Sequence, residues 1–199
     1  MFVNSNPSLQ PAFDSSGWGG PLGRPSILFD GAAHYLHCGS SLPTTLAGGT
    51  DTAFSLFWVA QQVSTAGIQN HLGFFRSTST QPLEDFFTSG GLYRSNRRDD
   101  AGTLVPVTGG TPDTSRHIFE AIYSGTAITF RIDGGLVFNN VAQDVGAITF
   151  DSMVLGCTYA NGSPDNFANL RLARLLGFTG AIGTTDADHV RSILTAMYM

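Results

Sequence analysis

The amino-acid sequence predicts an all-β domain with the architecture of a β-sandwich. Asp-Gly pairs occur at Asp30-Gly31 and Asp133-Gly134, each at the end of a segment in which apolar and polar residues alternate. Alternation is typical of a half-buried strand, and Asp-Gly supplies the positive backbone angles that a tight hairpin requires, so we interpret both aspartates as turn residues. The 24 glycines, the 15 phenylalanines and the charged content of 13% also favour short strands joined by turns. A chain of 199 residues is long enough for one such domain.

The strands are expected to begin after an irregular N-terminal segment. Residues 1–25 are predicted to form an arm or linker, because proline and glycine recur every few positions, and Trp18 is expected to anchor this arm against a neighbouring molecule. Residues 26–199 are predicted to form the sandwich. Segment 53–60 is the most apolar, so we expect a central buried strand there, with Trp58 in the core. The expected strands cover residues 27–29, 35–38, 53–60, 72–75, 86–87, 104–107, 117–123, 127–132, 136–141, 147–150, 153–157 and 170–178.

One amphipathic helix is expected, over residues 185–198. Thr185 can cap its N-terminus, with Asp188 three residues further on, and apolar residues then repeat at helical spacing. Such a helix would pack on the sandwich through its apolar face.

Composition excludes several classes of function. The net charge of −5 argues against a protein that binds nucleic-acid backbones, and no segment is apolar for long enough to insert into a membrane. All ten basic residues are arginine, so mechanisms that need a Schiff-base or phosphate-loop lysine are excluded. No signal peptide is visible at the N-terminus. Cys38 and Cys157 stand alone in apolar segments, which favours two small core residues, with pairing across the sandwich as the alternative.

Two polar segments are the candidate ligand-binding regions. The first is expected to be a loop that presents guanidinium and carboxylate groups, with an aromatic ring available for stacking on a sugar. A solvated loop or subunit contact is the alternative that we favour there, because neighbouring arginine and aspartate neutralise one another. The second loop carries oxygen atoms suited to calcium but lacks alternating acidic ligands, so we predict no cofactor and no metal, with calcium as an alternative. The candidate residues are Tyr93, Arg94, Asn96, Arg97, Asp99, Asp100, Asn161, Asp165 and Asn166.

No catalytic residue is predicted. Glycoside hydrolysis needs a pair of carboxyl groups, and the two glutamates, Glu84 and Glu120, lie in unrelated segments. His117 and Glu120 are three residues apart, which places them on opposite faces of a strand and rules out a shared metal. The nucleophile elbow Gly-x-Ser-x-Gly is absent from the sequence.

The order of these segments resembles the concanavalin A-like or laminin-G-like jelly roll found in phage structural proteins, such as tail, fibre or capsid-decoration proteins, and in bacterial surface proteins. The resemblance rests on residues 23–31 with Tyr35-Leu36, on residues 53–60, on residues 117–135, and on Leu155-Gly156 onward to the terminal helix. It implies an antiparallel jelly-roll β-sandwich. Such domains usually have one more strand before the proline-rich segment, and they carry an acidic residue where Arg174 stands, so a family site that uses this acid does not carry over.

These observations and the resemblance lead to one functional expectation. The protein is expected to be a non-enzymatic structural or adhesion module of a virion or cell surface that binds glycans through its edge loops. Its expected partners are further copies of itself or other virion or surface proteins. The alternatives are a polysaccharide-cleaving enzyme that uses aspartates such as Asp85 or Asp99, and a calcium-dependent soluble lectin.

Overall fold

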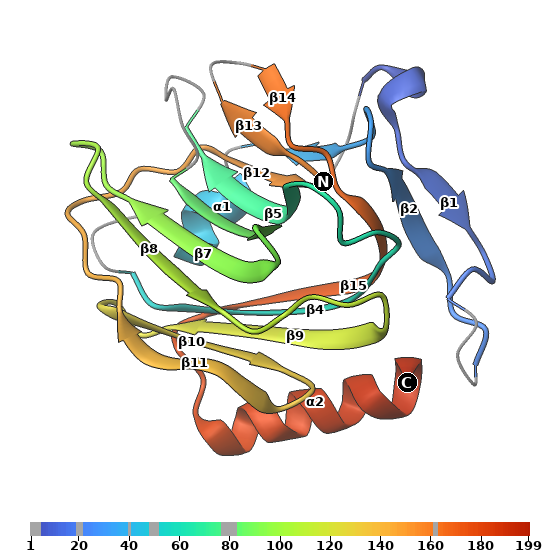
Figure 1. The fold of residues 1–199 in the computed structure, drawn as a ribbon. Coiled ribbons are helices and arrows are strands. Elements are labelled where there is room, and N and C mark those ends of the chain that lie inside the picture. The colour runs from blue at the N-terminus through green and yellow to red at the C-terminus, as the bar shows by residue number, and fades with distance from the viewer. Residues whose placement is uncertain (1–4, 19–21, 40, 48–51, 77–82, 161–162) are drawn as a thin grey trace.

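Two antiparallel sheets stacked face to face make up the body of the protein (Figure 1). The computed structural model describes residues 5–18, 22–39, 41–47, 52–76, 83–160 and 163–199. The seven-stranded sheet has the order β1 (Ala12–Asp14), β2 (Ser26–Asp30), β15 (Asn169–Thr179), β4 (Phe54–Gln62), β9 (Arg116–Tyr123), β10 (Ala127–Ile132) and β11 (Gly135–Ala142). The six-stranded sheet has the order β3 (Leu36–Cys38), β12 (Ser152–Leu155), β5 (Gln69–Phe75), β6 (Glu84–Ser89), β7 (Leu92–Arg98) and β8 (Leu104–Gly109).

Shorter elements decorate this sandwich. A small hairpin consists of β13 (Thr158–Ala160) and β14 (Ser163–Asp165), and a 3-10 turn, η1, covers Pro7–Leu9. The helices are α1 (Ser41–Ala47) and α2 (Thr184–Tyr198). The fold is therefore the predicted antiparallel jelly-roll β-sandwich with a C-terminal helix.

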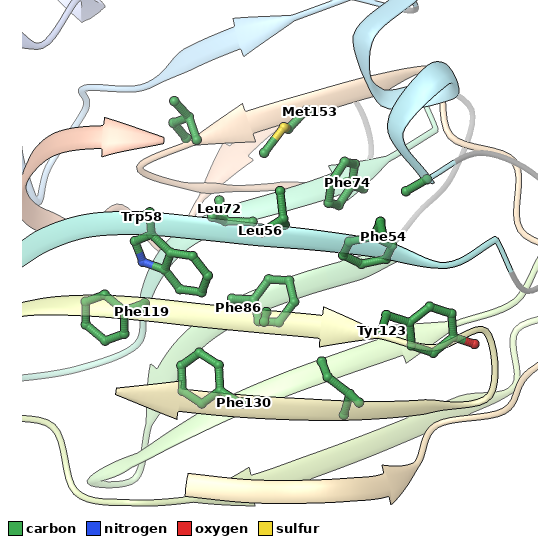
Figure 2. Close-up of a cluster of buried hydrophobic side chains, with 14 of the residues drawn as sticks. Phe54, Leu56, Trp58, Leu72, Phe74, Phe86, Phe119, Tyr123, Phe130 and Met153 are labelled. Atoms are coloured by element: carbon green, nitrogen blue, oxygen red, sulfur yellow. The ribbon is translucent and has the colours of Figure 1, made fainter. Parts of the chain in front are cut away.

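Aromatic side chains fill the space between the sheets (Figure 2). Strand β4 is central and buried along almost its whole length, as the apolar run predicted. Trp58 lies in the core, where its ring stacks on Phe119 with the ring centroids 5.1 Å apart. Such large side chains contribute most of the apolar area that folding removes from water, so this cluster dominates the stability of the sandwich.

Helix α2 covers the outer face of the seven-stranded sheet (Figure 1). Leu194 and Tyr198 of the helix belong to a second apolar cluster with Phe57 and Val59 of β4 and Ile118 of β9. The helix starts at Thr184, and its N-cap is Gly183, which makes no side-chain capping bond; the expected cap at Thr185 is wrong. Because both of its faces are covered, β4 is buried as a continuous run rather than in alternation.

Helix α1 was not expected from the sequence. It contains Pro43, which argues against a helix when it stands in the interior of one. In α1 the proline is the third residue, within the first turn, where no backbone N–H is required. Leu46 and Ala47 at the end of α1 belong to the core between the sheets.

The two Asp-Gly pairs have different structural roles. Asp133 and Gly134 have φ angles of 52° and 84° and form the predicted two-residue hairpin between β10 and β11. The expected hairpin at Asp30 is wrong, because β2 pairs with β1 and β15 while β3 belongs to the other sheet. Asp30 instead accepts hydrogen bonds from the backbone N–H groups of Ala32, Ala33 and His34, and this turn carries the chain from one sheet to the other.

Part of the segment expected to be an irregular arm is built into the domain. Strand β1 pairs with β2 at the edge of the seven-stranded sheet. Trp18 is fully buried, and its Nε1 donates a hydrogen bond of 2.6 Å to the carbonyl of Tyr198. The expected anchor on a neighbouring molecule is thus corrected, since Trp18 holds the N-terminal segment against the protein's own C-terminal helix.

Three further expectations can be compared with the structure. Residues 147–150 do not form a strand, and β12 pairs instead with β3 and β5. Cys38 and Cys157 are both buried, and neither forms a disulfide bond. Within the described ranges, no helix is long and apolar enough to cross a bilayer.

Candidate functional site

The first predicted ligand-binding segment is not a loop. Residues 92–98 form strand β7, in which the side chains of Tyr93, Ser95 and Arg97 are buried while those between them are half-buried. Tyr93 is only 3% exposed and packs edge-on against Phe119, so it offers no stacking surface to a sugar. Of the predicted ligand residues in this segment, Arg94 and Asn96 lie on the other face of the strand. The expectation of an exposed polar loop is therefore wrong.

Arg97 belongs to a polar network inside the sandwich. Its guanidinium donates a hydrogen bond of 2.8 Å to the carboxylate of Glu84 and stacks on the ring of Tyr123. Ser95 donates hydrogen bonds to Glu84 and to Gln143, whose amide in turn donates to the carbonyl of Ser95. Neither Glu84 nor Arg97 is exposed, so this network has a structural role.

The remaining predicted residues of this segment, Asp99 and Asp100, bind other groups of the protein itself. Asp99 accepts hydrogen bonds from the backbone N–H groups of Thr103 and Gly146, at 2.7 and 3.2 Å. Asp100 accepts from Thr149 and lies 3.0 Å from the guanidinium of Arg76. Both aspartates therefore hold loops together.

Asp85 also fails the test for glycoside hydrolysis. Burial, reinforced by the neighbouring carboxylate of Glu84, raises the pKa of Asp85 to about 8, which would suit a general acid. However, Glu84 pairs with Arg97 inside the sandwich, and consecutive residues of a strand point to opposite faces. Glu120 is buried against Arg131 and Arg191 beneath α2. These carboxyl groups therefore cannot flank one glycosidic bond.

The second predicted segment does line a hollow. This hollow, here called the edge hollow, has a volume of about 440 Å³. It lies between the turn after β2, the loop that joins β4 to β5, and the segment that follows β14. Asp165 and Asn166 line it as predicted ligand residues, whereas Asn161 lies outside the described part of the chain. The residues that line it are Asp30, Gly31, Ser64, Ala66, Gly67, Ile68, Gln69, Asp165, Asn166, Phe167 and Asn169.

Hydrogen bonds fix the three walls of the edge hollow to one another. Gln69 donates from Nε2 to the carbonyls of Ser64 and Ala66, at 2.6 and 2.9 Å, and its Oε1 accepts from the backbone N–H of Asn169. Asn166 has a φ of 50°, its N–H donates to Asp165, and its carbonyl accepts from the N–H of Asn70. The hollow is therefore preorganised rather than assembled when a ligand arrives.

The chemistry of the edge hollow is acidic and polar, with one aromatic wall. Burial alone would raise the pKa of Asp30, but hydrogen bonds from Ala33, Ala32 and His34 hold it below its ordinary value, so this carboxyl is ionised at neutral pH. Asp30 and Asp165 are exposed, and no described lining residue carries a positive charge. Phe167 continues the wall toward Tyr35, 6.4 Å away between ring centroids.

Sequence reasoning missed most of this site. Asp30 was assigned to turn geometry alone, and Gln69, Phe167 and Asn169 were not among the candidate residues. The walls are about 35 to 140 residues apart in the chain, so only the topology brings them together. The signal that was available is the Asp-Gly turn at Asp30, because a turn between sheets places its aspartate at an edge. Within the described ranges, no group of three or more histidine, cysteine or acidic residues could hold a metal ion.

Comparison with known proteins places the fold but no family. No protein-family model matches the sequence, and no curated protein matches it. The binding domain of botulinum neurotoxin serotype G superposes with a TM-score of 0.71 and 9% identity, over 98% of this chain and 46% of that one. The binding domain of botulinum neurotoxin DC, solved with rat synaptotagmin II, gives a TM-score of 0.64 and 9% identity, over 85% and 43%. The chain thus shares a jelly-roll sandwich with these domains and spans less than half of their length.

Part of one enzyme has a similar fold. The sialidase of Trypanosoma rangeli, in complex with the inhibitor DANA, superposes with a TM-score of 0.62 and 10% identity, over 84% of this chain and 27% of that one. At such identities the likeness shows the fold alone, and function has to be argued from the site. The similarity does not extend to the expected concanavalin A-like, laminin-G-like or phage-specific assignment.

Proposed function

We propose that the protein is a non-enzymatic carbohydrate-binding module whose ligand site is the edge hollow. The observation that carries this proposal is the preorganised set of exposed carboxylates and amides beside the ring of Phe167. Sugar hydroxyls are hydrogen-bond donors and acceptors, which carboxylates and amides match, and the C–H face of a sugar packs on an aromatic ring. Shallow polar sites with an aromatic wall provide both.

The charge of the edge hollow selects a class of sugar. Asp30 and Asp165 place two carboxylates in the walls, and no described lining residue is cationic. A sialic acid or sulfated sugar would meet like charges there, whereas the hydroxyls of a neutral hexose can donate to both carboxylates. We therefore propose neutral oligosaccharides as the ligands.

Several solved neighbours concern glycan recognition. One structure of botulinum neurotoxin type C relates to its interaction with two ganglioside molecules, and another shows a botulinum neurotoxin DC binding domain in complex with SialylT. These statements belong to those proteins, but they indicate that a domain of this fold can bind glycans. They support a role at an extracellular surface. We propose copies of the module or other surface proteins as its partners.

A binding assay with matched variants tests the proposal. Wild-type protein is applied to an array of neutral and sialylated oligosaccharides, and titration calorimetry then measures the best ligand. Asp165→Ala and Phe167→Leu are expected to weaken neutral-glycan binding by about tenfold or more, because each removes a direct contact. Asp186→Ala serves as the control, because this exposed aspartate lies on α2, away from the edge hollow.

Four outcomes would contradict the proposal or change it. The edge-hollow site is refuted by wild-type affinity in both Asp165→Ala and Phe167→Leu, and the glycan class is refuted by binding to sialylated sugars alone. Release of reducing sugar from a polysaccharide would show enzymatic activity instead. Loss of binding in EDTA that calcium restores would instead indicate a calcium-dependent lectin, in which the two carboxylates of the hollow are cation ligands.

A further inference from the structure

A second hollow lies between the sheets and is mostly apolar. This leucine groove has a volume of about 560 Å³ and is walled by strands of both sheets and by helix α1. This volume is typical of sites that bind small molecules. Its characteristic lining residues are Leu36, Leu42, Leu46, Leu155, Leu172 and Leu175.

Strand β15 has an open edge along this groove. Its pairing with β2 ends at Leu172, whereas its pairing with β4 continues to Thr179. The register shifts between Leu172 and Arg174, and β2 is preceded by Pro25, which has no backbone N–H to extend the ladder. In the part of the chain that the structure describes, residues 173–179 therefore have a strand neighbour on one side only.

This edge has only some of the features that protect exposed strands: a register shift and Arg174 at its start, and Leu46 of α1 beside Gly177. Charged side chains, proline and short length usually prevent such an edge from pairing. Arg174 is the only charged residue between Ala173 and Thr179. It lines the groove, is exposed, and has no ion-pair partner among the described residues. Nearby, Phe13 is 71% exposed and Leu42 is 43% exposed.

We propose that the leucine groove binds an extended peptide segment of a partner protein as an additional strand beside residues 173–179. The backbone of the peptide would pair with the open edge of β15, its apolar side chains would lie among the leucines, and an acidic side chain would meet Arg174. An acyl chain could fill the apolar volume but could not bond to the backbone groups of the edge, so the open strand favours a peptide. This site is separate from the edge hollow, and the inference does not rest on glycan binding.

Selection from a display library of random nonapeptides tests this inference. The selected peptides are expected to alternate apolar residues with polar ones and to contain one acidic residue. Arg174→Glu should weaken the affinity of the best synthetic peptide by about tenfold or more, since it replaces attraction with repulsion. Arg94→Glu is the charge-matched control, because Arg94 lies on β7 in the other sheet and does not line the groove.

Amide hydrogen exchange distinguishes strand addition from burial alone. Binding should slow exchange at backbone amides of residues 174–178, and a peptide N-methylated at alternate residues should lose both binding and protection. The inference is overturned if no peptide is selected, or if the selected peptides bind Arg174→Glu as they bind the wild type. Binding of palmitate in the groove without amide protection would assign the groove to lipid instead. A dimer that Arg174→Glu dissociates would assign it to a second copy.

Discussion

The carboxylate of Glu84 on β6 and the guanidinium of Arg97 on the neighbouring β7 form an ion pair of 2.8 Å. The pair lies in the space between the two sheets, where neither side chain is exposed to solvent. Removal of one partner leaves an uncompensated buried charge, so Arg97→Met should lower the free energy of unfolding by about 3 to 5 kcal/mol. The double variant Glu84→Leu, Arg97→Met should lose less than Arg97→Met alone. Urea unfolding of the single and double variants measures both effects.

Arg94→Met provides the control on the same strand, because Arg94 is half-buried on the opposite face of β7. It should change the free energy of unfolding by less than about 1 kcal/mol. If Arg97→Met were as mild as Arg94→Met, the ion pair would have no structural role.

Asp85 should make the protein less stable as the pH rises. Burial, with the Glu84 carboxylate, raises the pKa of Asp85 to about 8. Because the pKa of the folded state is raised, the stabilisation is fully present below the ordinary pKa near 3.8 and is lost as the pH rises toward 8. Asp85→Asn stays neutral, so its stability relative to the wild type should increase between pH 4 and pH 8. Urea unfolding at pH 4, 6 and 8 measures this trend, and a constant difference would show that the pKa of Asp85 is not raised in the folded state.

His117 should have the effect of a stabilising cation at mildly acidic pH. Its ring nitrogens lie 2.7 Å from Asp133 and 2.9 Å from Asp113, and these carboxylates, Asp133 foremost, raise its pKa above the ordinary 6.5 despite partial burial. The stabilisation is thus fully present below pH 6.5 and is lost as the pH rises through the folded-state pKa. Both carboxylates are partly exposed, so His117→Gln should cost only about 1 kcal/mol at pH 6 and less at pH 9.

An NMR titration of the His117 ring measures this pKa directly. Asp113→Asn removes one of the two carboxylates and should lower the pKa of His117, while the hydrogen bond to Asp133 remains. An unchanged pKa in Asp113→Asn would show that this carboxylate does not act on the ring.

Trp18 should be one of the most sensitive positions in the chain. Its indole is fully buried in the cluster beneath α2 and donates to the carbonyl of Tyr198. Trp18→Ala should lower the free energy of unfolding by about 3 to 5 kcal/mol because it leaves a large cavity. Trp18→Phe keeps most of the apolar contact but loses the hydrogen bond, and should cost about 1 kcal/mol. Chemical denaturation monitored by circular dichroism would reveal both effects, and equal midpoints for Trp18→Ala and wild type would contradict them.

The local pattern of the sequence was sufficient for much of the fold. The apolar run at β4, the Asp133-Gly134 hairpin and the amphipathic repeat of α2 are each decided by contacts within a few residues or by burial on one face. Helix α1 could not be predicted in this way. Its short length and its proline give a weak local signal, and packing of Leu46 and Ala47 into the core stabilises it.

The candidate sites were harder to predict because their partners are remote. The polar residues of β7 were predicted to form a loop, because no neighbouring residue in the sequence indicates that Arg97 pairs with Glu84 inside the sandwich. At the edge hollow, Asp165 and Asn166 were identified from their oxygen atoms. Asp30, Gln69 and Asn169 meet them only after β2, β5 and β15 have taken their places in the sheets. A single sequence does not contain that information in any local pattern.

The position of β15 also determines when the protein can fold. This strand is the last of the described strands in sequence order, yet it pairs with β2 and β4, which do not pair with each other. During synthesis, the two parts of the seven-stranded sheet therefore cannot join until residues 169–179 have emerged from the ribosome. The outer face of β4 stays uncovered until α2 follows. Apolar strands of the nascent chain therefore stay exposed for a long interval, and final folding should be slow because its decisive contacts are so distant in sequence.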